Sequence, residues 1–220
     1  MFNERPAGSR YNNTWDVDIV LKYLKTLHPV GDISLKLLTL KLNALLALVS
    51  AQRVQTLVSL STASMAILPD RVKFTVTSLL KTSSPTNGPV VIQVSRFTES
   101  QPLCPYRVLL EYLNRTCAVC ESTGVSDLLL SYVKPFKPTS TDTCARWLKM
   151  VLAASGIDTD TSTAHSYRGA TTSKAFAHGV SLDVILKTAN WSSESTFCRF
   201  YRKDILSCSD SFSNVILTTS

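Results

Sequence analysis

Hydrophobic positions follow helical spacing along most of the chain. In the first third, this spacing predicts three helices, over 15–28, 35–49 and 53–61. The first closes at His28-Pro29, because the residue before a proline disfavours helical backbone, and Asp32 or Ser34 caps the second. Leucines form a wide stripe on the second helix, which we therefore expect at the centre of the core. The same spacing predicts five later helices, over 105–120, 140–155, 165–178, 182–188 and 193–203.

Between the third and fourth of these helices, the period changes from helical to alternating. Val72, Phe74 and Val76 alternate with polar residues, which is the pattern of a strand with one buried face. Two or three antiparallel strands are predicted, within 66–68, 72–76 and 90–94. The predicted fold class is therefore α+β, mostly α-helical with a small antiparallel β-sheet near the N-terminal half.

Composition is typical of a globular protein with one sizeable domain. The 220 residues are 45% hydrophobic and 18% charged, which suits a chain that buries a core. No apolar run approaches the ~18–20 residues of a membrane helix. The N-terminus also lacks the apolar stretch of a secretory signal. We therefore expect an intracellular protein, nuclear or cytoplasmic, with no membrane partner.

The charge balance favours nucleic acid as a partner. The chain has 23 Lys and Arg residues against 16 Asp and Glu, a formal net charge of +7, and such an excess binds phosphate backbones in a salt-sensitive way. Among six cysteines, Cys117 and Cys120 form a CxxC with no second ligand pair at metal-site spacing. No metal and no cofactor is therefore expected. The alternative, a structural protein built on a zinc site at this pair, predicts stoichiometric zinc.

A His-x-x-Arg motif is the most informative short pattern. His165 and Arg168 are three residues apart at a predicted helix start, so both side chains lie on one face at the end that favours anions. Alone, this pair could also be an ordinary polar helix start. Earlier in the chain, Arg53 begins a predicted helix after the leucine-rich one. Later in the chain, the segment Trp191 to Tyr201 reads W-S-S-E-S-T-F-C-R-F-Y.

Together these residues resemble the catalytic domain of the tyrosine recombinases, the phage integrase-like enzymes. The resemblance covers nearly all of 15–205 and keeps the family's order of arginine, lysine, His-x-x-Arg, His or Trp, and tyrosine. The Trp-to-Tyr wording is closest to recombinases of DIRS-like, Ngaro-like and Crypton mobile elements. The resemblance implies a site-specific recombinase or integrase that cleaves and rejoins double-stranded DNA without metal or nucleotide.

The resemblance also implies a role for each motif residue. The two arginines, Arg53 and Arg168, would grip the scissile phosphate, and Tyr201 would attack it to form a 3′-phosphotyrosine link. His165 would transfer the proton at the attacking oxygen, because its ordinary pKa of about 6.5 suits both directions. Trp191 would donate its indole N–H to a phosphate oxygen. Lys81 is the candidate general acid for the departing 5′-oxygen, and Lys73 is its rival.

Three features depart from the family's pattern. Tyr201 follows Trp191 by ten residues rather than nine, and Thr56 stands where many members have an acidic residue. The family's N-terminal DNA-clamping domain has no room in this sequence. We therefore expect only the catalytic half, with 1–14 as a flexible arm, 15–205 as the catalytic domain and 206–220 as a tail.

The family also implies a homotetramer on DNA, in which the tail docks on a neighbouring protomer. The tail's apolar patch at 215–217 suits such docking, or it covers the domain's own core. The alternative function is a domesticated DNA-binding remnant that no longer cleaves.

Overall fold

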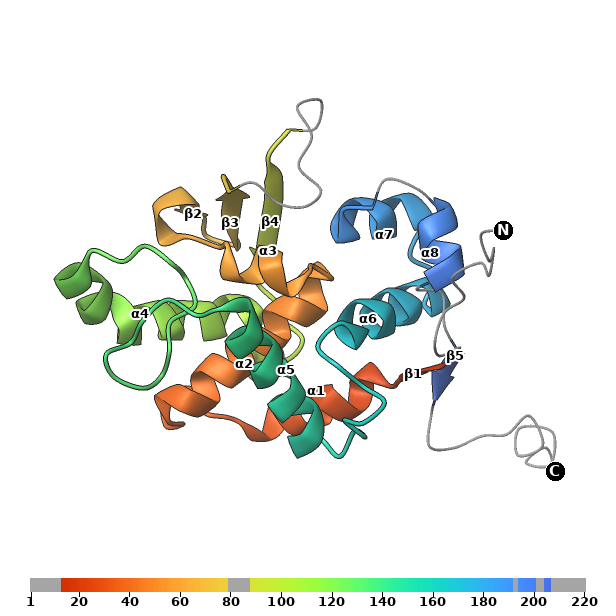
Figure 1. Cartoon of the computed structure of the whole chain (residues 1–220), viewed down its shortest axis with the longest axis horizontal. Coiled ribbons are helices and arrows are strands. Elements are labelled where there is room, and N and C mark those ends of the chain that lie inside the picture. Colours follow the sequence, from red (N-terminus) through yellow and green to blue (C-terminus); the bar gives the residue numbers. More distant parts are fainter. Residues whose placement is uncertain (1–12, 79–87, 192–193, 201–203, 207–220) are drawn as a thin grey trace, which may run out of the picture.

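Helix α2 (Leu35–Ser50) is the centre of the fold (Figure 1). The computed structural model of the chain describes residues 13–78, 88–191, 194–200 and 204–206. Ser34 caps α2 as one of the two predicted choices, because its Oγ accepts the Leu37 N–H at 3.3 Å. Twelve of the 16 residues of α2 are buried. The leucine stripe is thus part of a helix that is enclosed on almost every side.

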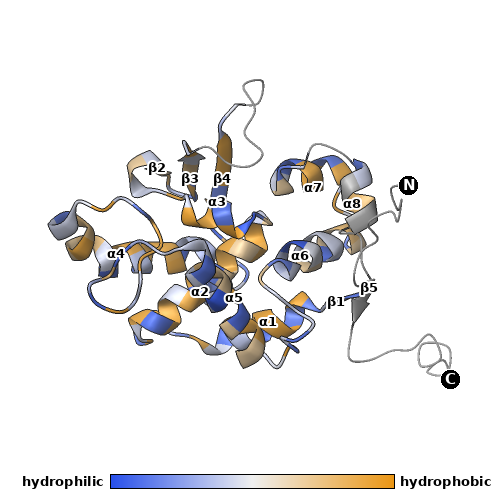
Figure 2. Cartoon of the chain, viewed as in Figure 1, coloured by the Kyte–Doolittle hydropathy of each residue, from blue (hydrophilic) through white to orange (hydrophobic). Residues whose placement is uncertain are grey.

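The other predicted helices are also present, and they enclose α2 or one another. Helices α3 (Val54–Val58), α4 (Pro105–Thr123), α5 (Thr141–Ala154) and α6 (Ser166–Ala177) contact α2, and α1 (Val17–Thr26) packs across α5 and α6. In Figure 2, hydrophobic and hydrophilic residues alternate along α1, as expected for a helix with one face on the core. The largest fully buried apolar side chains of this main core are Trp147, Tyr112, Tyr167 and Phe74.

The predicted antiparallel sheet is confirmed. It consists of β2 (Met65–Ile67), β3 (Arg71–Val76) and β4 (Val90–Ser95), with β3 in the middle. Val72, Phe74 and Val76 are buried and the residues between them are half-exposed, so the alternation in the sequence does mark the two faces of the strand. Short 3₁₀ turns at Thr62–Ser64 and Gln101–Leu103 flank the sheet.

The chain departs from the sequence prediction just before α1. The predicted helix start at Trp15 is wrong, because the helix begins two residues later, at Val17, after Asp16 caps it by accepting the Asp18 N–H at 2.9 Å. Trp15 lies in β1 (Asn13–Trp15), which pairs in parallel with β5 (Asp204–Leu206). Asn13 and Thr14, which were expected in the flexible arm, are therefore part of a strand, and β5 was not predicted.

Three helices near the C-terminus form one end of the molecule (Figure 1). Helix α6 ends before Gly179, whose φ of 79° allows the turn into α7 (Leu182–Ala189), and α8 (Glu194–Phe200) follows. A second, smaller apolar cluster holds this end together and consists of Ala51, Ile185, Ala189, Trp191 and Phe197. Within the described residues, no helix has both the length and the apolar character that crossing a membrane requires.

Candidate active site

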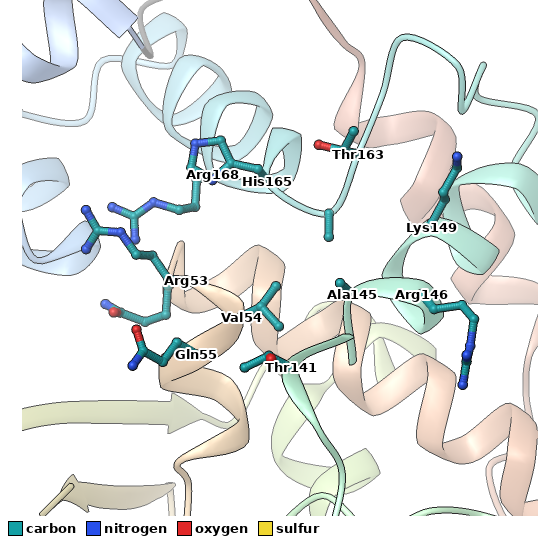
Figure 3. Close-up of a pocket in the computed structure, with 12 residues that line it drawn as sticks. Arg53, Val54, Gln55, Thr141, Ala145, Arg146, Lys149, Thr163, His165 and Arg168 are labelled. Carbon is teal, nitrogen blue, oxygen red and sulfur yellow. The ribbon is translucent and has the colours of Figure 1, made fainter. Parts of the chain in front are cut away.

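A cavity of about 580 Å³ lies where the segments before α3, along α5 and at the start of α6 meet (Figure 3). Its walls come from residues 52–55, 141–149 and 163–168. Three of the residues predicted from the sequence, Arg53, His165 and Arg168, line it. Segments that are more than 100 residues apart in the sequence thus bring the two arginines and the histidine to one place.

Arg53 is positioned by the turn between α2 and α3. Ala51 ends α2 with a left-handed backbone (φ 50°), which redirects the chain. The Arg53 carbonyl then accepts the N–H groups of Thr56 and Leu57, at 2.9 and 3.1 Å, and begins α3. Because its backbone is held in this way, the half-buried Arg53 side chain extends into the cavity (Figure 3).

His165 and Arg168 both lie at the amino end of α6, as the spacing predicts. His165 occupies the N-cap position and is exposed, whereas Arg168 is only 1% exposed. Figure 3 shows the side chains of Arg53 and Arg168 reaching toward the same side of the cavity. The start of a helix adds the partial positive charge of its N–H groups, so this position suits an anion.

Trp191 contacts the buried Arg168. The guanidinium carbon of Arg168 lies 4.9 Å from the centroid of the indole ring, and its Nη2 donates to the Ala189 carbonyl at 3.0 Å. The backbone N–H of Trp191 donates to the Leu186 carbonyl at 2.9 Å, and this bond holds Trp191 against the end of α7. A guanidinium removed from water is costly unless its donors and its charge are satisfied. The end of α7 and the indole face therefore hold Arg168 in its place.

Two further cations on α5 line the same cavity, and sequence reasoning missed them. Arg146 and Lys149 are exposed and are three residues apart, so they lie on one face of the helix. This spacing was the available signal, although it is common on surface helices. Among the described lining residues four are Arg or Lys and none is acidic, so the described lining of the cavity is rich in positive charge.

The remaining predicted site residues are not placed in the cavity. Lys73 is on β3, paired with Ala66 on one side and Gln93 on the other, and it is not among the lining residues. Lys81 and Tyr201 lie outside the described residues, so the choice between the two lysines stays open. Helix α8 ends at Phe200, the residue before Tyr201.

The cysteine pair lies on α4, far along the chain from the cavity residues. Cys117 donates toward Glu121 at 3.1 Å, and this contact raises the pKa of its thiol. Burial raises the pKa of the Cys120 thiol. Raised values disfavour the thiolate that both metal binding and redox chemistry need. Over the described part of the chain, no group of three or more His, Cys, Asp or Glu is arranged to hold a metal ion.

Comparisons with known proteins establish the fold. The XerA recombinase matches 97% of this chain over 66% of its own length, with a TM-score of 0.64 and 14% identity. The XerH site-specific recombinase bound to its difH substrate matches 94% of this chain over 53% of its own, with a TM-score of 0.62 and 10% identity. A lambda integrase tetramer bound to a Holliday junction matches 91% over 51%, with a TM-score of 0.56 and 20% identity.

The chain therefore has the fold of a tyrosine recombinase catalytic domain. It spans between about half and two thirds of the length of the structures that it matches. It matches no family model and no curated protein in sequence. At identities of 20% or below, this likeness concerns the fold.

Proposed function

We propose that the chain is the catalytic domain of a site-specific DNA recombinase or integrase that cleaves and rejoins double-stranded DNA through a 3′-phosphotyrosine link. The observation that carries this proposal is the meeting of Arg53, His165 and Arg168 in one cation-lined cavity, with Trp191 against Arg168. Two guanidinium groups that extend to one side of a cavity suit a phosphate as ligand, because its oxygens accept their paired N–H donors.

Each residue has a chemical task in this proposal. Arg53 and Arg168 neutralise the charge that builds up on the phosphate as Tyr201 attacks, and this stabilises the transition state. His165 carries the proton at the attacking oxygen, since an imidazole can accept and donate near neutral pH. Trp191 donates its indole N–H to the phosphate and supports Arg168 with its ring face. Lys81, or its rival Lys73, protonates the leaving 5′-oxygen.

Burial argues against two other tyrosines as the nucleophile. Tyr167, next to Arg168 in sequence, is 1% exposed and its hydroxyl donates to the Leu148 carbonyl at 3.2 Å. Burial raises the pKa of Tyr167 far above its usual range, and it raises the pKa of Tyr112 to about 12. A nucleophile needs the opposite environment, in which nearby positive charge favours the phenolate. Tyr201, one residue beyond α8, supplies a hydroxyl at the position that the family's order requires.

The proposed partners follow from the same comparison. The XerH and lambda integrase structures contain DNA, and the latter is a tetramer. We infer double-stranded DNA and a homotetramer as partners of this chain. We also infer that 15–205, extended at each end by the paired strands β1 and β5, is the catalytic domain between an N-terminal arm and a C-terminal tail. We also propose a mobile-element origin in the DIRS-like, Ngaro-like or Crypton group, on the wording of the segment from Trp191 to Tyr201.

Covalent trapping tests this function directly. The protein is incubated with labelled nicked or supercoiled DNA without magnesium and is then denatured with detergent. We expect a protein–DNA adduct that disappears in Tyr201→Phe and persists in the control Tyr23→Phe, whose hydroxyl has no role in the cavity. If the wild-type protein binds DNA and never links to it, the cleavage proposal falls and a DNA-binding remnant replaces it.

A further inference from the structure

Gln52, the residue before Arg53, is buried where the turn that carries Arg53 meets the end of α7. Gln52 is only 7% exposed, and its Nε2 donates to the Thr188 carbonyl at 2.7 Å. A longer contact of 3.4 Å joins the same nitrogen to the Ser50 carbonyl. Thr188 is 136 residues away in sequence, on the last turn of α7.

The next carbonyl of α7 binds the other arginine segment. Ala189 accepts from Arg168 Nη2 at 3.0 Å, one residue after the carbonyl that Gln52 holds. Two consecutive carbonyls at the carboxyl end of α7 thus receive a donor from the segment of Arg53 and a donor from Arg168 itself. These unpaired helix-end carbonyls are natural acceptors, because no later turn of α7 supplies them with N–H groups.

Apolar packing connects the same two segments, the turn before Arg53 and α7. Ala51, on the other side of Gln52 from Arg53, packs with Ile185 and Ala189 of α7 and with Trp191. Phe197 of α8 joins this cluster, with its ring centroid 5.7 Å from that of Trp191. The segment 51–53 is therefore connected to α7 and, through Trp191, to α8, which ends just before Tyr201.

We propose that Gln52 is a positioning residue for the DNA-cleavage reaction. In this role Gln52 does not itself bind the phosphate. Its amide ties α7 to the turn that carries Arg53, and this fixes the separation of Arg53 and Arg168 and the placement of α8 relative to both. This inference rests on the proposed function.

The test compares Gln52→Met with Tyr106→Phe in the full chain. Gln52→Met keeps the length of the side chain and removes the amide donor. Tyr106→Phe removes a matched side-chain-to-backbone hydrogen bond, from Tyr106 Oη to the Leu68 carbonyl at 3.1 Å, outside the cavity. We expect both to lower the melting temperature similarly. Only Gln52→Met should slow single-turnover adduct formation, by about 10- to 100-fold, with the Kd for DNA within about twofold of wild type.

Gln52→Glu adds a pH readout. A protonated carboxyl can donate to the Thr188 carbonyl, whereas a carboxylate facing that carbonyl repels it. We expect the rate of Gln52→Glu relative to wild type to rise as the pH falls, while the relative rate of Gln52→Met stays flat. Equal rates for Gln52→Met and wild type would overturn the inference, and so would an equal loss in Tyr106→Phe or a loss explained by weaker DNA binding.

Hydrogen exchange separates this inference from the proposed function. Without its Gln52 contact, the carboxyl end of α7 should exchange its backbone amides faster in Gln52→Met than in Tyr106→Phe. This readout needs no cleavage, so it remains decisive if the wild-type protein forms no adduct. Unchanged exchange over 182–191 would refute the tie itself, whereas faster exchange with an inactive wild type would refute only the catalytic proposal.

Discussion

Two buried cations in this chain serve different ends because their chemistry differs. Arg168 keeps its charge at any relevant pH and is held by the Ala189 carbonyl and the Trp191 ring at the edge of the cavity. Lys41 is 0% exposed within α2, and its Nζ donates to the Leu27 carbonyl at 2.6 Å, just after the end of α1. An amine can lose its proton when it is buried. Burial lowers the pKa of Lys41 to about 8. The bond from Lys41 to Leu27 links α2 to the end of α1, which is a structural role.

This lowered pKa predicts a pH-dependent stability. The unfolded chain, with a lysine pKa of 10.5, binds more protons than the folded chain above pH 8, so the free energy of unfolding rises with pH there. Between pH 7 and 9 the contribution of Lys41 should grow by about 1 kcal/mol. Chemical denaturation of wild type and Lys41→Met at both pH values isolates this contribution, which the variant should lack. The same pH response in both proteins would contradict the assignment.

Among the elements, strand β1 contacts two others that are distant in sequence, β5 and α6. It pairs in parallel with β5, the strand that begins three residues after Tyr201. Its last residue, Trp15, is 6% exposed and donates from Nε1 to Ser166 Oγ at 2.7 Å, in the first turn of α6. The Trp15 ring also meets Tyr167 edge-on, with ring centroids 5.1 Å apart. A three-residue strand thus supports the helix that carries Arg168.

The bond between Trp15 and Ser166 should be measurable by a double-mutant cycle. Trp15→Phe removes the donor, Ser166→Ala removes the acceptor, and the double variant removes both. We expect a coupling free energy of about 1 kcal/mol, the usual net value of a neutral hydrogen bond. Urea denaturation of the four proteins gives this value. Strict additivity would show that the contact does not contribute to stability.

For the whole molecule, the distribution of charge matters more than its sum. The net charge of +7 already favours nucleic acid, but the fold gathers Arg53, Arg146, Lys149 and Arg168 around one cavity without an acidic lining residue among those described. The α5 wall extends this positive surface beyond the two arginines that would hold the scissile phosphate (Figure 3). Neighbouring phosphates of a bound duplex are the ligands that such a surface suits.

Removing the two α5 cations should therefore weaken binding and change its salt dependence. We expect Arg146→Ala and Lys149→Ala each to reduce the slope of log K against log salt by about 1, similarly for all DNA sequences. Fluorescence anisotropy with duplex DNA at several salt concentrations measures this slope. Lys22→Ala, an exposed cation on α1 that does not line the cavity, is the control and should leave the slope unchanged. Equal slopes for all variants would place the DNA elsewhere.

The sequence by itself determined most of the helices and the antiparallel sheet, and it pointed to several of the residues that line the candidate site. Periodicity is a local property, so the burial of α2 and the two faces of β3 could be predicted from spacing alone. Arg53, His165, Arg168 and Trp191 were expected in one site because they keep the order of the family that the sequence resembles.

Only the tertiary structure decided which distant segments touch. The bond from Gln52 to Thr188 spans 136 residues and that from Trp15 to Ser166 spans 151. The same holds for the parallel pairing of β1 with β5 and for the α5 wall of the cavity. Such contacts depend on how packed helices bring backbone carbonyls and side chains together. The local sequence around a glutamine or a tryptophan is the same whether or not a distant segment supplies its hydrogen-bond partner.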